Sequence, residues 1–235
     1  MANKTYVISL GGSLIVPPSG IDHKFLKKFR ALIISEIKKG NRFVITTGGG
    51  HTAREYQEAS SKITKLTDED QDWIGIHSTH LNAHLVKTIF RSYAHPRINK
   101  NPRTKANLKN HFKHGEKIMV AAGWRPGWST DYVSTILAKR LGAKTVINLS
   151  NVKYVYNKDP KKFKDAKKLT NLTWLEFRKI VGNKWDPGLN APFDPVAAEH
   201  AQKLGLEVII MNGKNINNLK KYFSNKPFQG TTIIN

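Results

Sequence analysis

The sequence predicts an α/β protein built as a three-layer sandwich, with a mainly parallel central sheet between two layers of helices. The first observation is the alternation of short β-branched runs with amphipathic segments along all 235 residues, which is typical of a parallel sheet covered on both faces. The second is the composition, because 39% hydrophobic and 24% charged residues are ordinary globular values. The third is that three of the predicted strands end in glycine, at the edge where such sheets bind ligands.

The first half of the chain alternates strands with helices. A helix is predicted over residues 22–39, with Asp22 as its N-cap and Gly40 as its stop. A second helix is predicted over 51–59, and apolar residues between 81 and 90 mark a longer one. The strands of this half are predicted at residues 6–10, 42–47 and 117–122.

The second half continues the alternation. Its predicted helices cover residues 130–141, 173–181, 194–204 and 216–223. Its predicted strands cover residues 145–149, 207–211 and 231–234. No repeat or low-complexity linker divides the chain, so we expect a single domain over residues 1–235.

The absence of cysteine limits the chemistry. With no cysteine in the chain, disulfides, thiolate zinc sites and cysteine nucleophiles are excluded, and the chain suits a reducing cytoplasm. The start of the sequence lacks the pattern of a secretory signal, and no apolar window approaches the ~18 residues of a membrane span. We therefore expect a cytoplasmic protein without membrane association.

The charge is strongly positive. Lysine and arginine number 39 against 17 acidic residues, a net charge of +22. Residues 91–117 hold eight of these bases against one glutamate, and residues 158–168 hold six lysines against two aspartates. Two interpretations stay open: the charged surface of a protein from a basic proteome, or a surface that contacts nucleic acid nonspecifically.

Glycines at the carboxyl ends of strands are the first candidates for a site. The three places are Gly11-Gly12-Ser13, Gly48-Gly49-Gly50, and Gly123 with the loop that follows it. A glycine turn before a helix lets backbone N–H groups approach a phosphate, although a single such turn also occurs for steric reasons alone. The chain lacks both the dinucleotide-binding fingerprint and the P-loop, so neither of those phosphate cradles is predicted.

Several polar side chains lie beside these glycines. Arg54 follows Gly50 by one helical turn, where its guanidinium could reach an oxyanion or simply be solvated. Asp131 and Asp194 each open a predicted helix and could be N-caps, the interpretation we favour for Asp131. Histidines at helical spacing, His77, His80 and His84, have no carboxylate at a matching offset, so no metal site is predicted there.

Together these residues resemble the amino acid kinase superfamily, and within it the archaeal-type uridylate (UMP) kinases. The resemblance rests on short blocks in a specific order and spacing over nearly the whole chain. These blocks are Gly11-Gly12-Ser13, Gly48 to Tyr56, Asp72 to Ile76, Asn82-Ala83, Pro126-Gly127, Thr130-Asp131, Asn151-Val152, Val155-Tyr156, Asp159-Pro160, Asp194-Pro195 and Gly230 to Ile233. The resemblance implies the amino acid kinase (carbamate kinase-like) fold, with an acceptor-binding half at about 1–142 and an ATP-binding half at about 143–235.

The resemblance also implies roles for single residues. The residues implied for ATP are Gly12, Ser13, Gly50, Arg54, Ser150, Asn151, Tyr156 and Asp159. The residues implied for UMP are Gly49, Asp72, Trp124, Arg125, Pro126, Gly127, Trp128, Ser129 and Thr130. Arg54, Ser13 and Asp194 are the implied catalytic residues, with Asp194 beside the transferred phosphoryl group; no side-chain metal site is predicted.

The function implied is the transfer of the γ-phosphoryl group of ATP to UMP, giving UDP and ADP in pyrimidine nucleotide biosynthesis. Mg²⁺ would accompany ATP, and the protein would be a homo-oligomer, commonly a hexamer built from dimers. Two alternatives stay open. One is a kinase of the same superfamily with another small phosphate or carboxylate as acceptor. The other is a noncatalytic homologue that binds nucleotides or polyanions.

The chain departs from the family pattern at four places, one of which is the aromatic loop Trp185-Asp186-Pro187-Gly188, which has no counterpart role in the family. Lys153 and Tyr154 stand where an aspartate and a glycine are usual, beside the implied ATP site. Ser9 stands where bacterial members carry a lysine. The acceptor loop is bulkier and more basic than usual, because it contains Trp124, Arg125 and Trp128.

Overall fold

A seven-stranded, mainly parallel sheet organises the protein. The computed structural model describes residues 4–160, 162–182 and 191–235, so the aromatic loop from Trp185 to Gly188 lies outside the described residues. The strand order is β3-β2-β1-β4-β8-β9-β7, and all neighbours are parallel except the antiparallel pair of β8 and β9. The strands are β1 (Thr5–Leu10), β2 (Arg42–Thr47), β3 (Ile118–Ala121), β4 (Thr145–Ser150), β7 (Asn171–Thr173), β8 (Glu207–Asn212) and β9 (Thr231–Ile234).

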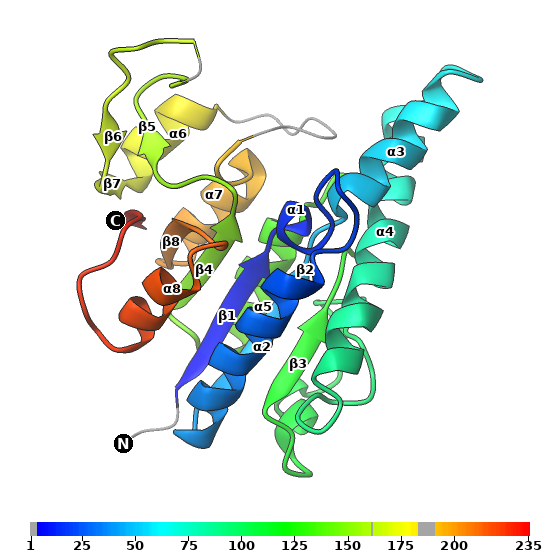
Figure 1. Cartoon of the computed structure of the whole chain (residues 1–235), viewed down its shortest axis with the longest axis vertical. Coiled ribbons are helices and arrows are strands. Elements are labelled where there is room, and N and C mark those ends of the chain that lie inside the picture. The colour runs from blue at the N-terminus through cyan, green and yellow to red at the C-terminus, as the bar shows by residue number, and fades with distance from the viewer. Residues whose placement is uncertain (1–3, 161, 183–190) are drawn as a thin grey trace.

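The helices cover both faces of this sheet (Figure 1). The two predicted layers are therefore present, and the α/β three-layer prediction is confirmed. One layer contains α2 (His23–Lys38), α4 (Asp68–Ile89) and α8 (Ile216–Phe223), and the other contains α5 (Thr130–Leu141), α6 (Trp174–Val181) and α7 (Pro195–Lys203). The strands of the implied acceptor half, β3-β2-β1, join those of the implied ATP half through the pairing of β1 with β4.

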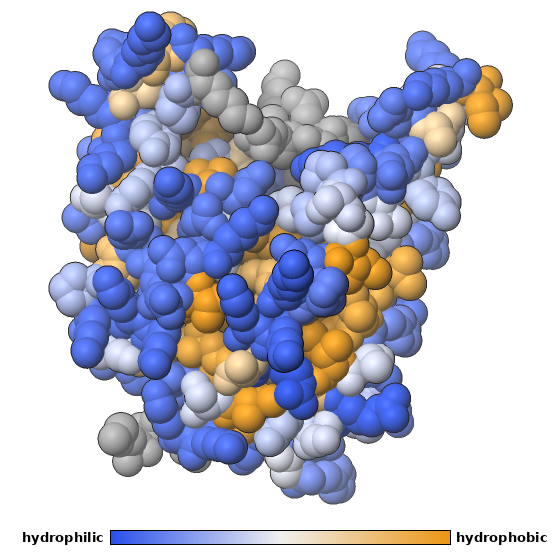
Figure 2. All heavy atoms as spheres, in the orientation of Figure 1, coloured by the Kyte–Doolittle hydropathy of each residue, from blue (hydrophilic) through white to orange (hydrophobic). Residues whose placement is uncertain are grey.

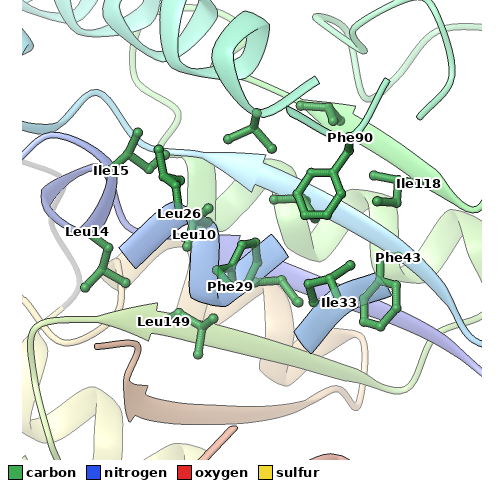
Figure 3. Packing of buried hydrophobic residues seen from close by; sticks show 14 of the residues in the cluster. Leu10, Leu14, Ile15, Leu26, Phe29, Ile33, Phe43, Phe90, Ile118 and Leu149 are labelled. Atoms are coloured by element: carbon green, nitrogen blue, oxygen red, sulfur yellow. The ribbon is translucent and has the colours of Figure 1, made fainter. Parts of the chain in front are cut away.

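Alternate residues of each strand enter two separate cores. Ile8 and Leu10 of β1 pack with Phe29 and Ile33 of α2 on one face (Figure 3). Val7 of the same strand lies in the other core, with the apolar side chains of α5, α6 and α7. This period of two follows from strand geometry, and burial on both faces explains why the strands are mainly apolar.

Most predicted elements appear within one or two residues of their expected ends. The Asp22 carboxylate accepts a hydrogen bond from the Phe25 N–H at 2.8 Å, which confirms the predicted N-cap of α2. The predicted helix over 130–141 and the strand over 42–47 are present with the same bounds. Local periodicity and capping residues were sufficient to predict these bounds, because the bounds depend on residues that are neighbours in the sequence.

Smaller elements lack such a signal. The structure adds α1 (Gly12–Ile15), the 3₁₀ helix η1 (Leu108–Phe112), the edge strand β7 of the main sheet, and a two-stranded ribbon of β5 (Val155–Tyr156) and β6 (Lys168–Leu169). Each has five residues or fewer, too short for a hydrophobic period to be visible.

Helices α3 (Gly50–Ser61) and α4 form a hairpin that projects beyond the carboxyl edge of the sheet (Figure 1). α4 begins at Asp68, well before the apolar residues that marked it in the sequence, behind a capping box of Thr67 and Asp70. Figure 2 shows a hydrophobic patch at the outer end of this projection, and Ile63, just after α3, is 86% exposed.

None of the helices within the described residues has the length and apolar character that crossing a membrane requires.

Candidate functional site

The glycines after β1 and β2 are in direct backbone contact. A Cβ atom on Gly12 would lie 2.0 Å from the Gly50 nitrogen and 2.6 Å from the Gly48 carbonyl carbon. Gly50 has a φ of +71°, a conformation that side chains with a Cβ rarely adopt. Because strands β1 and β2 are neighbours in register, their glycine turns meet at the edge where the sequence predicted a site.

Four backbone N–H groups in these turns are free. The N–H groups of Gly12, Ser13, Gly49 and Gly50 have no acceptor within the described part of the chain. The carbonyls of Gly48 and Gly49 are instead held by the Asn82 side-chain amide, at 2.8 and 3.0 Å. The turn is thus fixed through its acceptors while its donors stay available, as an anion site requires.

A cavity of about 210 Å³ opens beside this turn. Residues that the resemblance implied for UMP (Gly49, Asp72, Trp128, Ser129, Thr130) and for ATP (Gly50, Arg54) line it together, with Ala53, Gln57, Gln71, Gly75, Ile76, Thr79 and Gly123. Arg54 is exposed and has no acidic partner among the described residues. Its guanidinium is therefore available for an anion.

The loop from Gly123 to Ser129 forms one wall of this cavity and is held at both ends. The Gly123 N–H donates to the Thr79 hydroxyl at 2.8 Å, and the Gly127 N–H donates to an Asp72 carboxylate oxygen at 2.7 Å. Gly127 has a φ of +79°. Of the implied UMP residues, Trp124 to Gly127 do not line the cavity.

Two buried carboxylates lie at the carboxyl ends of β1 and β4. Asp131 accepts hydrogen bonds from the Ser9 hydroxyl at 2.7 Å, the Asn148 amide at 3.0 Å and the Asp194 N–H at 3.3 Å. Our interpretation of Asp131 as an N-cap is wrong, because the Ser129 hydroxyl caps α5 by accepting from the Tyr132 N–H. Asp194 does cap its helix, α7, through the Ala197 N–H.

Burial raises the pKa of both carboxyl groups. Desolvation, together with the negative charge of the nearby Asp131, raises the pKa of Asp194 to about 7 against hydrogen bonds that lower it. Asp131 keeps a partly accessible surface as a residue, yet desolvation of its carboxylate also raises its pKa. One Asp194 oxygen, Oδ2, is buried without a hydrogen-bond partner among the described residues, so this group has capacity for a further donor or cation.

The residues implied for the adenosine end of ATP lie apart from the cavity. Ser150 ends β4 beside Gly11, whose N–H donates to the Leu149 carbonyl at 2.7 Å. Tyr156 belongs to the β5–β6 ribbon, with Asp159 in the turn beyond it. In Figure 1, α1 lies between this ribbon and the α3–α4 hairpin.

The sequence interpretation missed part of the site. Asn82, which holds the glycine turn, had appeared only as part of a motif, and the Ser9–Asp131–Asn148 contacts were not predicted. Ser129 was the available signal for the N-cap of this helix. Serine is a favoured N-cap residue and directly precedes the predicted helix, whereas Asp131 is already its second residue. Among the described residues no group of three or more histidines or carboxylates could hold a metal ion.

Comparisons with known proteins agree on one family. The profile of the amino acid kinase family matches residues 4–212. The chain is 34% identical to a uridylate kinase of Pyrococcus abyssi over 97% of this chain and 98% of that one. It is 32% identical to a uridylate kinase of Thermoplasma volcanium over 98% of both.

Solved structures show the same fold. The uridylate kinase of Archaeoglobus fulgidus superposes with a TM-score of 0.78 at 28% identity, covering 99% of this chain and all of that one. The UMP kinase of Ureaplasma parvum has a TM-score of 0.79 at 18% identity, with both chains fully covered. The fold implied by the sequence resemblance is therefore confirmed.

Replacing Asp194 by Asn should remove a pH dependence of stability. The unfolded carboxyl group ionises near its ordinary pKa of 3.8, whereas the folded one ionises near 7. The stability that this carboxyl group provides in its protonated form is therefore fully present below pH ~4. It is lost as the pH rises through ~7. At pH 8 we expect Asp194→Asn to raise the free energy of unfolding by on the order of 2–4 kcal/mol.

Urea unfolding at pH 5 and pH 8 measures this difference. Asn retains an oxygen to cap α7, so loss of the cap does not confound the comparison. Equal pH dependence in the wild type and Asp194→Asn would contradict the raised pKa.

Proposed function

We propose that this chain, which belongs to the amino acid kinase family, transfers the γ-phosphoryl group of ATP to UMP to give UDP and ADP. The observation that carries the proposal is the turn at Gly49 and Gly50, whose free N–H groups border a cavity lined by Asp72 and Arg54. The uridylate kinases similar to it over nearly their full length support the choice of acceptor.

The geometry suits a transfer without a general base. A UMP phosphate oxygen is already ionised; it forms a bond to the γ-phosphorus while the bond to the β,γ-bridging oxygen breaks and ADP leaves. Such a reaction depends on alignment and on stabilising the negative charge of the transferred group. In the proposal the N–H groups of Gly12, Ser13 and Gly50 bind that charge, and Arg54 reaches it from the first turn of α3.

Asp194 has a separate part in the proposal. Its unpartnered Oδ2 offers one carboxylate oxygen, and Asp131 offers a second carboxylate beside it. Mg²⁺ commonly takes one or two protein carboxylates and completes its shell with substrate phosphates and water, so these two groups fit a Mg²⁺ that arrives with ATP. When bound, the ion would neutralise phosphate charge.

The homo-oligomer and the cytoplasmic location belong to the same proposal. Support for an oligomer comes from exposed apolar side chains on the α3–α4 hairpin, since large exposed apolar groups commonly mark protein contacts. Tyr56, Ile63, Trp73 and Leu81 are 65%, 86%, 41% and 63% exposed.

The experiment that tests the function is an ADP-release assay with ATP and Mg²⁺ against a panel of acceptors. The panel is UMP, CMP, dUMP, isopentenyl phosphate, N-acetylglutamate and carbamate. Turnover with UMP is expected. Turnover with a different acceptor alone would retain phosphoryl transfer and overturn the acceptor, and ATP binding without any turnover would favour a noncatalytic homologue.

Replacing Arg54 by Ala should lower kcat/KM at least tenfold. The loss corresponds to about 1.4 kcal/mol or more of transition-state stabilisation, because the guanidinium is the cationic side chain lining the cavity. Steady-state kinetics with ATP and UMP measures it. Arg91→Ala, an exposed arginine outside the cavity, is the matched control, and unchanged turnover in Arg54→Ala would exclude the role.

Replacing Asp72 by Ala should raise the KM for UMP and leave the KM for ATP unchanged. Asp72 lines the cavity and accepts a hydrogen bond from the Gly127 N–H. The variant therefore loses both a substrate contact and the hydrogen bond that holds the loop. Asp72→Asn retains an oxygen for Gly127 and separates the two effects. A rise in the KM for ATP instead would show that the acceptor side is assigned wrongly.

A second candidate function is nonspecific binding of single-stranded RNA. Seven of the eight bases within 91–117 are exposed, and none of the eight has an acidic partner within 4.0 Å among the described residues. The segment lies along the outer edge of β3, where Ala94 and Asn99 bridge to Ile118 and Ala121. Lysine and arginine side chains that gather on one edge without acidic partners form a positively charged surface, which is typical of phosphate binding.

Binding of a labelled oligouridylate should weaken at least tenfold between about 50 and 200 mM salt. The variant Lys105→Glu/Lys109→Glu/Lys113→Glu should lose this binding and retain UMP kinase activity. The control is a variant with the same change in charge on α2, in which three exposed lysines are replaced by Glu: Lys24, Lys27 and Lys28. Binding that survives about 0.5 M salt, or equal loss in both variants, would contradict a phosphate contact on this edge.

A further inference from the structure

Aromatic rings lie in a row behind the wall of the acceptor cavity, each tilted relative to the next. The ring centroids of Trp128 and Tyr132 are 4.1 Å apart, and those of Tyr132 and His200 are 4.6 Å apart. The Trp124 ring lies 6.2 Å from that of Trp128. The row joins the acceptor loop to α5 and α7, so the loop is packed against the body of the protein through these rings.

Arg103 reaches this row from outside the loop. Its Nη2 donates to the Tyr132 hydroxyl at 3.0 Å. Its guanidinium carbon lies 5.4 Å from the Trp124 ring centroid and 5.7 Å from that of Trp128. One side chain therefore contacts two rings of the loop and one ring of α5, in the range of cation–π attraction.

The backbone around Arg103 is anchored to the same helix. The Arg140 guanidinium, near the end of α5, donates to the carbonyls of Pro102 at 2.6 Å and Ala106 at 3.0 Å. The Arg103 N–H itself donates to the Asn101 side chain at 2.9 Å. Arg103 thus projects from a fixed segment, and its contact with the loop is held on both sides.

A second arginine shares the rings without providing such an anchor. The Arg125 guanidinium carbon lies 4.4 Å from the Trp124 centroid and 5.5 Å from that of Trp128. Arg125 belongs to the loop, so its contacts stiffen the loop internally but tie it to nothing else. Neither Arg103 nor Arg125 has an acidic partner within 4.0 Å among the described residues.

The contact with Trp128 connects Arg103 to the site. Trp128 lines the cavity, whereas Arg103 does not. Gly127, directly before Trp128, has a positive φ and allows the loop to turn there. Asp72 of α4 holds this turn by accepting from the Gly127 N–H. Arg103, in the segment before β3, contacts the Trp128 side chain.

We propose that Arg103 is a positioning residue for the acceptor nucleotide: it fixes the Trp128 indole as a wall of the cavity. The planar ring then offers a preformed face to a pyrimidine nucleotide, which saves the cost of ordering the loop on binding. This inference rests on the proposed function. It places part of the acceptor affinity in a side chain that does not touch the acceptor.

Arg103→Met should raise the Kd for UMP, measured by calorimetry without ATP, about five- to thirtyfold. The kcat at saturating UMP and the KM for ATP should stay within about twofold of wild type, because the transferred phosphoryl group is bound elsewhere. Arg103→Lys keeps the charge without the planar guanidinium and should give an intermediate loss. A general loss of folding would lower kcat without this selective change.

Two further variants isolate the contact. Lys105→Met removes the same charge from an exposed side chain of the same segment and should leave the Kd unchanged. Tyr132→Phe removes the hydroxyl that Arg103 donates to and keeps the ring. Its effect should be non-additive with Arg103→Met, because both changes break one interaction.

A readout that needs no substrate separates this inference from the proposed function. Acrylamide should quench tryptophan fluorescence more strongly in Arg103→Met than in wild type or Lys105→Met, since Trp124 and Trp128 lose a cover. If the wild type fails to bind UMP while quenching changes as expected, the acceptor is wrong and the Arg103 contact stands. Unchanged quenching and an unchanged Kd in Arg103→Met would overturn the inference.

Discussion

The backbone contact between the glycine turns after β1 and β2 is the constraint on which the rest of the site depends. A single methyl group on Gly12 would overlap the backbone of Gly50, so the two turns can meet only without side chains. Their meeting directs free N–H groups outward, while Asn82 holds the carbonyls from α4. An anion site made from backbone donors is rigid, and rigidity is what charge stabilisation requires.

The second constraint is the burial of two carboxylates below this edge. Asp131 accepts hydrogen bonds from Ser9 and Asn148, whereas one Asp194 oxygen has no partner in the described part of the chain and the Asp194 pKa is about 7. Such a group costs folding free energy at neutral pH. A bound cation would offset this cost, because an opposite charge favours the ionised carboxylate.

The acceptor loop and the basic edge of the sheet are linked in this chain. The segment from 91 to 117 pairs with the edge of β3 and sends Arg103 onto the rings of the loop. Six of its other seven lysines and arginines are exposed, and none of the seven has an acidic partner within the described residues. The high charge therefore has two local consequences, a contact that orders the loop and a surface suited to polyanions.

The sequence by itself determined most of the longer elements and the edge of the sheet where the candidate site lies. Periodicity, caps and glycines at strand ends are local signals, so α2, α5 and the residues near Gly50 could be predicted from neighbours in the chain. Only the tertiary structure decided that Asp131 bonds to Ser9 rather than capping α5, and that Arg103 meets Trp128. Those contacts join residues far apart in sequence, and their geometry depends on the strand order and on how the loops pack against it.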